Sequence, residues 1–161
     1  VITLEEELKT LENYLLIEQF CSGNLFDYEI NVNDDLESDY INIPPMLVQP
    51  FIENAIKHGM RKIDSETNKQ KNQNLILVDF SEQNSSLCCI VTDNGIGRVQ
   101  AAELNKKSME TYHESTALLV TQERLGLFGT SDQNASFEII DLYDENKEAC
   151  GTKVIIKIPL N

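Results

Sequence analysis

The chain has 161 residues, of which 41% are hydrophobic and 25% are charged, and its formal net charge is −14 at pH 7. This length fits one folded domain, and no apolar run approaches the ~20 residues that cross a bilayer. The negative charge repels nucleic acid and anionic lipid, so a phosphate-bearing ligand requires a locally positive pocket. We therefore expect no nucleic-acid partner, whereas the composition does not argue against a nucleotide.

The chain contains four cysteines without metal-binding spacing, at positions 21, 88, 89 and 150. We interpret them as reduced thiols of a cytosolic domain. Residues 1–7 include neither an initiator Met nor the basic and apolar stretches of a signal peptide. We therefore expect this sequence to be a piece of a longer protein.

The first element is predicted to be an amphipathic helix over roughly residues 3–20. Thr3 and Glu6 have the spacing of a capping box, and leucines recur at helical spacing at positions 4, 8, 11 and 15. Residues 25–32 then alternate between apolar and polar, which is typical of a half-buried strand.

The rest of the chain alternates helices with paired strands. Pro44 and Pro45 indicate the start of a mostly buried helix over 46–58. Further along, the pattern predicts a solvated loop over 61–74, strands over 75–81 and 87–92, a helix over 118–128, and strands over 135–142 and 152–158. This order favours an α/β fold, a two-layer sandwich with helices on one face of a mixed, mostly antiparallel sheet. It lacks the regular βαβ alternation of a doubly wound fold.

The end of the 46–58 helix carries a cluster of polar side chains. Asn54 shares a helix face with Lys57 at i, i+3 and with His58 at i, i+4. An Asn carbonyl oxygen can complete the shell of a Mg²⁺ ion that keeps phosphate and water ligands, and a lysine can neutralise phosphate charge. The alternative is an ordinary solvated helix end.

Two further motifs contain glycine, and the first of them, Asp93 to Gly97, follows an apolar strand. Asp93 can accept a hydrogen bond from an exocyclic amine such as that of adenine, and Gly95 and Gly97 would let the backbone approach a ligand. Gly151 and Thr152 precede an alternating strand. The alternatives are a simple Asp-Asn-Gly turn for the first motif and an ordinary strand start for the second.

An Asn on a helix, then Asp-x-Gly-x-Gly and then Gly-Thr, in this order, resemble the N, G1 and G3 boxes of the GHKL ATPases. The segment 43–59, IPPMLVQPFIENAIKHG, resembles more specifically the sensor histidine kinases of the LytS/YehU type. The segments LEEEL at 4–8 and QERL at 122–125 are similar to the same family. The resemblance implies the Bergerat (GHKL) ATP-binding fold over residues 25–161, preceded by a linker helix in residues 1–24.

The resemblance also implies roles for individual residues. Asn54 would coordinate Mg²⁺, Lys57 would contact phosphate, and His58 would lie along the nucleotide. Asp93 would bind the adenine amine, and Thr152 would lie near Asp93 through a water. Gly95 and Gly97 would line the base pocket. Glu53, with Asn54, is the candidate catalytic residue, because a glutamate polarises water in related ATPases.

One segment departs from the family pattern. The glycine-rich G2 segment of the ATP lid is replaced by residues 115–118, STAL. Backbone amides at a helix N-terminus can hold phosphate, so Ser115 and Leu118 are candidate nucleotide contacts.

The resemblance implies the ATP-binding catalytic domain of a two-component sensor histidine kinase, which passes the γ-phosphate of ATP to a histidine upstream of this sequence. The implied partners are the upstream dimerisation and phosphoacceptor domain, a response regulator and a second copy of the full-length protein. The full-length protein is expected to be anchored in the cytoplasmic membrane, with this domain in the cytoplasm. The alternatives are a GHKL ATPase, an anti-sigma-type serine kinase, and a degenerate kinase domain that serves as a docking module.

Overall fold

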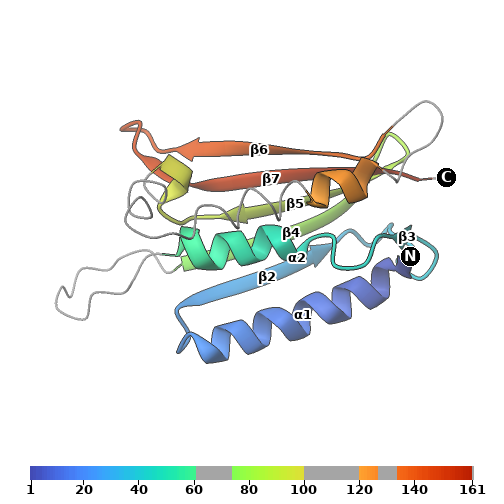
Figure 1. Cartoon of the computed structure of the whole chain (residues 1–161), viewed down its shortest axis with the longest axis horizontal. Coiled ribbons are helices and arrows are strands. Elements are labelled where there is room, and N and C mark those ends of the chain that lie inside the picture. Colours follow the sequence, from blue (N-terminus) through green and yellow to red (C-terminus); the bar gives the residue numbers. More distant parts are fainter. Residues whose placement is uncertain (61–73, 100–119, 127–133, 161) are drawn as a thin grey trace.

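A five-stranded sheet forms one layer of the molecule. The computed structural model describes residues 1–60, 74–99, 120–126 and 134–160. The strands lie in the order β2-β4-β5-β7-β6 (Figure 1). Their bounds are β2 Phe26–Val32, β4 Asn74–Gln83, β5 Ser86–Asp93, β6 Ser136–Tyr143 and β7 Ala149–Pro159. Only the β2–β4 pair is parallel, which confirms the mixed, mostly antiparallel sheet.

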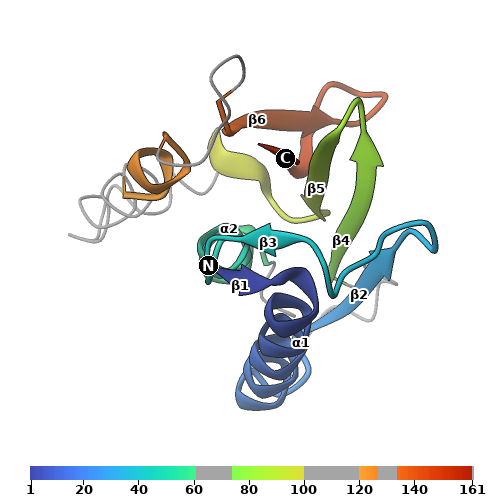
Figure 2. The same ribbon diagram turned by 90° about the vertical axis from the view of Figure 1, so that its right-hand side faces the viewer.

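The helices form the second layer, on one side of the sheet (Figures 1 and 2). They include α1 (Leu4–Cys21), α2 (Gln49–Asn54), the π-helical turn η1 (Ala55–Gly59) and a helix over 120–126, and residues 97–99 are helical as well. Two short strands that the sequence did not predict, β1 (Ile2–Thr3) and β3 (Asn42–Ile43), pair with each other. Within the described ranges, no helix is both long enough and apolar enough for a membrane crossing.

The start of α1 follows from its capping box. The backbone N–H of Glu6 donates to Thr3 Oγ1 at 3.2 Å, and Thr3 N–H donates to Glu6 Oε2 at 2.9 Å. These bonds satisfy two N–H groups that would otherwise lack partners at the helix end. Leu4, Leu11 and Leu15 are buried, so the predicted apolar face is the one that packs.

The start of α2 differs from the prediction. The helix begins at Gln49, with Pro50 in its first turn, rather than after Pro44 and Pro45. Met46 has a positive φ of 54°, which an α-helix cannot include, and the N–H groups of residues 46–48 donate to a side chain of α1. The tight turn before α2 therefore replaces the first helical turn.

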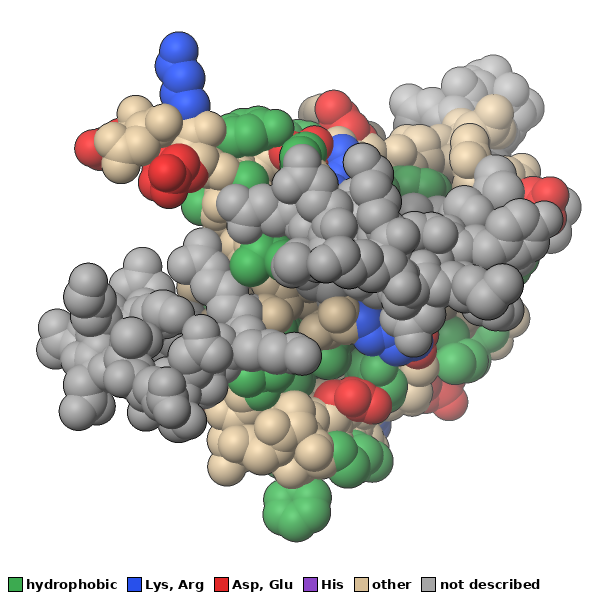
Figure 3. Space-filling view, turned by 60° about the vertical axis from the view of Figure 1, so that its left-hand side comes forward, with side chains coloured by type: hydrophobic (Ala, Val, Ile, Leu, Met, Phe, Trp, Pro, Cys, Tyr) green, Lys and Arg blue, Asp and Glu red, His purple; other side chains and the backbone are tan. Residues whose placement is uncertain are grey.

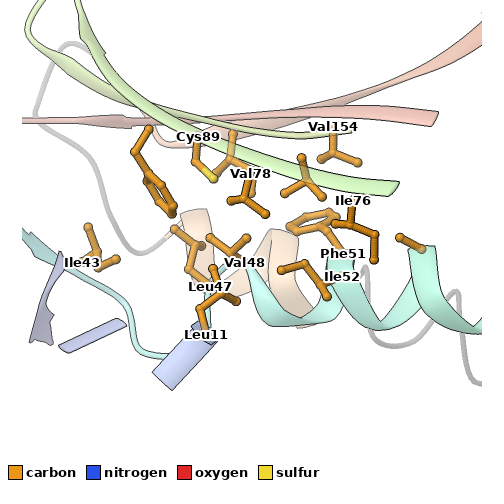
Figure 4. Packing of buried hydrophobic residues seen from close by; sticks show 14 of the residues in the cluster. Leu11, Ile43, Leu47, Val48, Phe51, Ile52, Ile76, Val78, Cys89 and Val154 are labelled. Carbon is orange, nitrogen blue, oxygen red and sulfur yellow. The ribbon is translucent and has the colours of Figure 1, made fainter. Parts of the chain in front are cut away.

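Buried side chains fix α2 against the sheet (Figure 4). Phe51 points toward the sheet and lies beside Ile76 in Figure 4, and Ile52 is buried as well. Phe51 also contacts Phe137 of β6 edge to face, with ring centroids 5.1 Å apart. Full burial of such a side chain contributes roughly 2 kcal/mol. The helix that carries Asn54 is thus held in a defined position over the sheet.

Candidate functional site

Asp93 ends β5 with its carboxylate inside the protein. The residue is only 5% exposed. Its Oδ1 accepts a hydrogen bond of 2.9 Å from the backbone N–H of Gly95. Thr152, which pairs with Asp93 across β5 and β7, donates to the carboxylate from both its N–H and its hydroxyl. A direct contact therefore joins two residues that the sequence analysis expected to be neighbours through a water.

Burial raises the pKa of Asp93 to about 6, because the charged carboxylate is desolvated. The hydrogen bonds from Gly95 and Thr152 oppose this shift by stabilising the charged form. At neutral pH the group is thus an ionised acceptor in a water-poor place. Such a group binds an N–H donor strongly, since charge-assisted hydrogen bonds exceed neutral ones in strength.

The N-terminal motif and the first glycine motif meet beside Asp93. The carbonyl oxygen of Gly59 accepts a hydrogen bond of 2.8 Å from the N–H of Ile96. A Cβ on Gly95 would lie 1.9 Å from that carbonyl oxygen, and a Cβ on Gly59 would lie 3.0 Å from Asp93 Oδ1. The absence of a side chain at Gly95 therefore allows close packing against Gly59. From the sequence we had expected it to allow the approach of a ligand.

Gly151 closes the other side of Asp93. Its φ is 138°, and a Cβ at this position would lie 1.9 Å from the carbonyl oxygen of Asp93. Gly97 is buried and packs against Ala149 of β7. Gly59, Gly95 and Gly151, one glycine from each of the three segments, thus lie close to Asp93.

Asn54 is the last residue of α2 and is half-buried. The next five residues form the π-turn η1, which ends at Gly59 beside Asp93. We expected an α-helix through His58, and this expectation is wrong: residues 55–59 form a π-turn, which has more residues per turn than an α-helix. Asn54 and His58 are therefore not aligned by α-helical spacing. Short π segments inside helices occur frequently at functional sites.

The other polar residues of this motif lie in different surroundings. Lys57 lies on η1 and is exposed. Glu53 Oε1 accepts a hydrogen bond of 2.9 Å from Gln49 Nε2, one helical turn earlier. The backbone of His58 belongs to η1, and its side chain lies outside the described part of the chain.

Asn54 is the residue that was expected to bind Mg²⁺. The described residues include no group of three or more His, Cys, Asp or Glu side chains that could hold a metal ion. Asn54 offers one hard oxygen atom, and Mg²⁺ commonly takes few protein ligands beside substrate phosphates and water. The donor set fits a metal that arrives with a phosphate chain.

Two predicted nucleotide contacts, Ser115 and Leu118, lie outside the described residues.

On the face shown in Figure 3, acidic side chains are spread among hydrophobic ones over the described surface.

Two further residues, which no sequence motif pointed to, shape the surroundings of α2. Glu7 is 1% exposed and binds backbone N–H groups just before α2. Arg124 donates to the carbonyl oxygen of Pro45. One signal could have identified Glu7, because it lies three residues after Leu4 and four before Leu11, on the buried stripe of α1.

The chain is similar in sequence to two staphylococcal proteins. It is 36% identical over 135 residues to the sensor protein LytS of Staphylococcus epidermidis. The aligned region covers 81% of this chain and 21% of that protein. It is 34% identical over 134 residues to the sensor histidine kinase/phosphatase LytS of Staphylococcus aureus, covering 81% of this chain and 22% of that protein. The chain thus spans about a fifth of the length of these relatives. No protein-family model matches the chain.

Solved histidine kinase structures share the fold. The histidine kinase domain of the blue-light activated histidine kinase from Erythrobacter litoralis EL346 matches 99% of this chain and 66% of that chain, with a TM-score of 0.59 and 18% identity. The histidine kinase AdeS of Acinetobacter baumannii matches the same shares, with a TM-score of 0.61 and 10% identity. The sequence similarity confirms the relationship that the motifs indicate, and these structures confirm the expected fold.

Proposed function

Since the chain is homologous to part of the LytS-type sensor histidine kinases, we propose that it binds Mg-ATP and presents the γ-phosphate to a histidine outside this sequence. The observation that carries the proposal is the buried carboxylate of Asp93 among three glycines. An adenine amino group is a donor of the size and polarity that such an acceptor selects. Guanine has a carbonyl oxygen where adenine has this amino group. It would therefore place a hydrogen-bond acceptor against the carboxylate and bind less well.

The metal and the phosphates belong on the α2 side of Asp93. Asn54 would supply one oxygen ligand to Mg²⁺, and Lys57 would bind phosphate oxygens from its exposed position on η1. The ion, when bound with the nucleotide, neutralises charge on the phosphate chain. The role of this chain in the reaction is therefore to hold and orient ATP.

Phosphoryl transfer depends largely on positioning and on electrostatic stabilisation of the transferred group. The acceptor histidine, the dimerisation region and the response regulator would lie elsewhere in the full-length protein or in a partner. Residues 1–24 would link this domain to the acceptor region, with residues 25–161 forming the nucleotide-binding unit. A membrane anchor would likewise belong to the rest of the protein. This chain alone should bind ATP without phosphorylating itself.

A nucleotide titration tests the proposal. Mg-ATP should raise the melting temperature of the chain, because a ligand that binds only the folded state stabilises it, whereas Mg-GTP should have a much smaller effect. Asp93→Asn should abolish the preference for ATP, and Asn54→Ala should abolish the dependence on Mg²⁺. Asp34→Asn removes the same charge from an exposed turn and serves as the control. No shift with millimolar Mg-ATP in the unmodified chain would contradict the proposal and favour a docking module.

A further inference from the structure

The peptide group between Pro45 and Met46 is bound at both ends by charged side chains. Its N–H donates to Glu7 Oε2 at 2.8 Å. Its carbonyl oxygen, on Pro45, accepts a hydrogen bond from Arg124 Nη2. Glu7 belongs to α1, and Arg124 belongs to the helix over 120–126. A single peptide group therefore connects two helices that lie far apart in the sequence.

The carboxylate of Glu7 is fully engaged in this region. It is buried, and its Oε1 also accepts from the N–H groups of Leu47 at 2.8 Å and Val48 at 3.4 Å. Hydrogen bonds to an ionised acceptor are shorter and stronger than neutral ones. A buried carboxylate without such partners would be strongly destabilising. The position of Glu7 and that of residues 46–48 are therefore mutually dependent.

The backbone of this turn is strained. Met46 has a φ of 54°, although it is neither Gly nor Asn, and its side chain is 49% exposed. Packing of the side chain thus does not account for the conformation. Such a conformation persists only where the surroundings impose it, and it is concentrated at functional sites and switches. Here the peptide group that precedes the Cα atom of Met46 is bound by the two charged side chains.

The turn is continuous with α2. Leu47 and Val48 are buried at 2% and 0% exposure, and the carbonyl oxygen of Val48 accepts from the N–H groups of Phe51 and Ile52 at 3.1 and 3.3 Å. Figure 4 shows Leu47 and Val48 pointing into the core beside Leu11 of α1. A displacement of the 45–46 peptide therefore moves the start of the helix that ends at Asn54.

We propose that Glu7 and Arg124 are positioning residues that hold the 45–46 peptide from its two ends and thereby set the position of α2, with Asn54, relative to α1 and the 120–126 helix. This inference rests on the proposed function and adds a route by which α1 acts on the nucleotide site. A shift of α1 moves Glu7, and Glu7 moves the turn before α2. The affinity for Mg-ATP then depends on how α1 is held.

Hydrogen exchange tests the connection without any nucleotide. Glu7→Gln keeps the size of the side chain but replaces one acceptor oxygen with a donor, so that three N–H groups lose a charged partner. We expect faster amide exchange in α2 and in the 120–126 helix, and Arg124→Gln should accelerate exchange in α1. Glu12→Gln removes the same charge from an exposed position of α1 and should change neither region. Acceleration confined to residues 44–48 would overturn the inference.

Nucleotide affinity separates a positioning role from a purely structural one. At a temperature well below melting, Glu7→Gln and Arg124→Gln should each raise the Kd for Mg-ATP by about fivefold, the low end of typical coupling between sites. The double variant should fall short of the product of the two effects, because both residues act on one peptide group. A lower melting temperature with unchanged Kd would overturn the inference. If the unmodified chain binds no Mg-ATP, the proposed function fails, and the exchange experiment alone decides whether the connection exists.

Discussion

Thr152 lies opposite Asp93 across β5 and β7 and donates to its carboxylate from both the backbone N–H and the hydroxyl. The carboxylate is nevertheless buried enough for its pKa to rise to about 6. The fold therefore keeps a costly ionised group at neutral pH. A ligand that donates a hydrogen bond would reduce this cost, which connects stability with binding.

The first prediction concerns the stability of Asp93→Asn. A carboxyl group whose pKa is raised from 3.8 to about 6 contributes stability that is complete below 3.8 and is lost as the pH rises through 6. This loss corresponds to roughly 3 kcal/mol at most. The neutral amide avoids it, so the variant should be more stable than the unmodified chain at pH 7.5, and the difference should shrink toward pH 4. Urea unfolding at several pH values measures this.

Asp34→Asn is the control for this experiment, because Asp34 is exposed and its replacement should leave the pH profile unchanged. A variant at position 93 that is less stable than the unmodified chain at every pH would contradict this prediction, because the carboxyl group would then stabilise the fold in both protonation states. The same variant should lose its preference for adenine, so that a gain in stability accompanies a loss of binding.

The second prediction concerns the pH dependence of adenine binding. The ionised carboxylate accepts the amine, so affinity should be full above the pKa of Asp93 and should fall as the pH drops below about 6. One pH unit below the pKa, affinity should be about tenfold weaker. Adenosine is the ligand of choice, because it carries no phosphate that titrates in this range. Affinity independent of pH between 5 and 7.5 would contradict a contact between Asp93 and the base.

The sequence predicted the layered fold well because its signals are local. Alternation in residues 25–32 and the leucine spacing of α1 depend only on which face is buried. The π-turn and the start of α2 at Gln49 were missed for a physical reason. They depend on Glu7 and on the contact between Gly59 and Ile96, which join segments far apart in the chain. Sequence spacing contains no direct information on such contacts.

The surroundings of Asp93 were predicted in the same uneven way. From the order of the motifs along the chain we expected Asp93 and Thr152 to be neighbours, and the two residues pair across β5 and β7. The packing role of Gly95 was missed, because only the fold brings the Gly59 carbonyl oxygen against it. Likewise, nothing in the sequence distinguishes Arg124 from other residues of a helix. Its hydrogen bond to the carbonyl oxygen of Pro45 depends on the fold.

The third prediction concerns Gly95. A Cβ here would lie 1.9 Å from the carbonyl oxygen of Gly59, so Gly95→Ala must displace η1 or the 93–96 turn. We expect a loss of about 2 kcal/mol or more in the free energy of unfolding, together with weaker nucleotide binding. Gly126→Ala is the matched control, since a Cβ at position 126 would have no neighbouring atom within 4 Å and alanine favours a helix. Equal stability of the two variants would contradict the tight contact.

The last prediction concerns the hydroxyl of Thr152. Thr152→Val keeps the shape and the backbone N–H bond but removes the hydroxyl donor, which lowers the pKa of Asp93. The pKa should therefore rise further in the variant, and the pH midpoint for adenosine binding should move upward with it. Thr92→Val, which faces away from Asp93 on the same strand, is the control and should leave the midpoint in place. An unchanged midpoint in Thr152→Val would mean that the hydroxyl does not act on the carboxylate. A uniform loss of affinity at every pH would instead assign the hydroxyl to ligand contact.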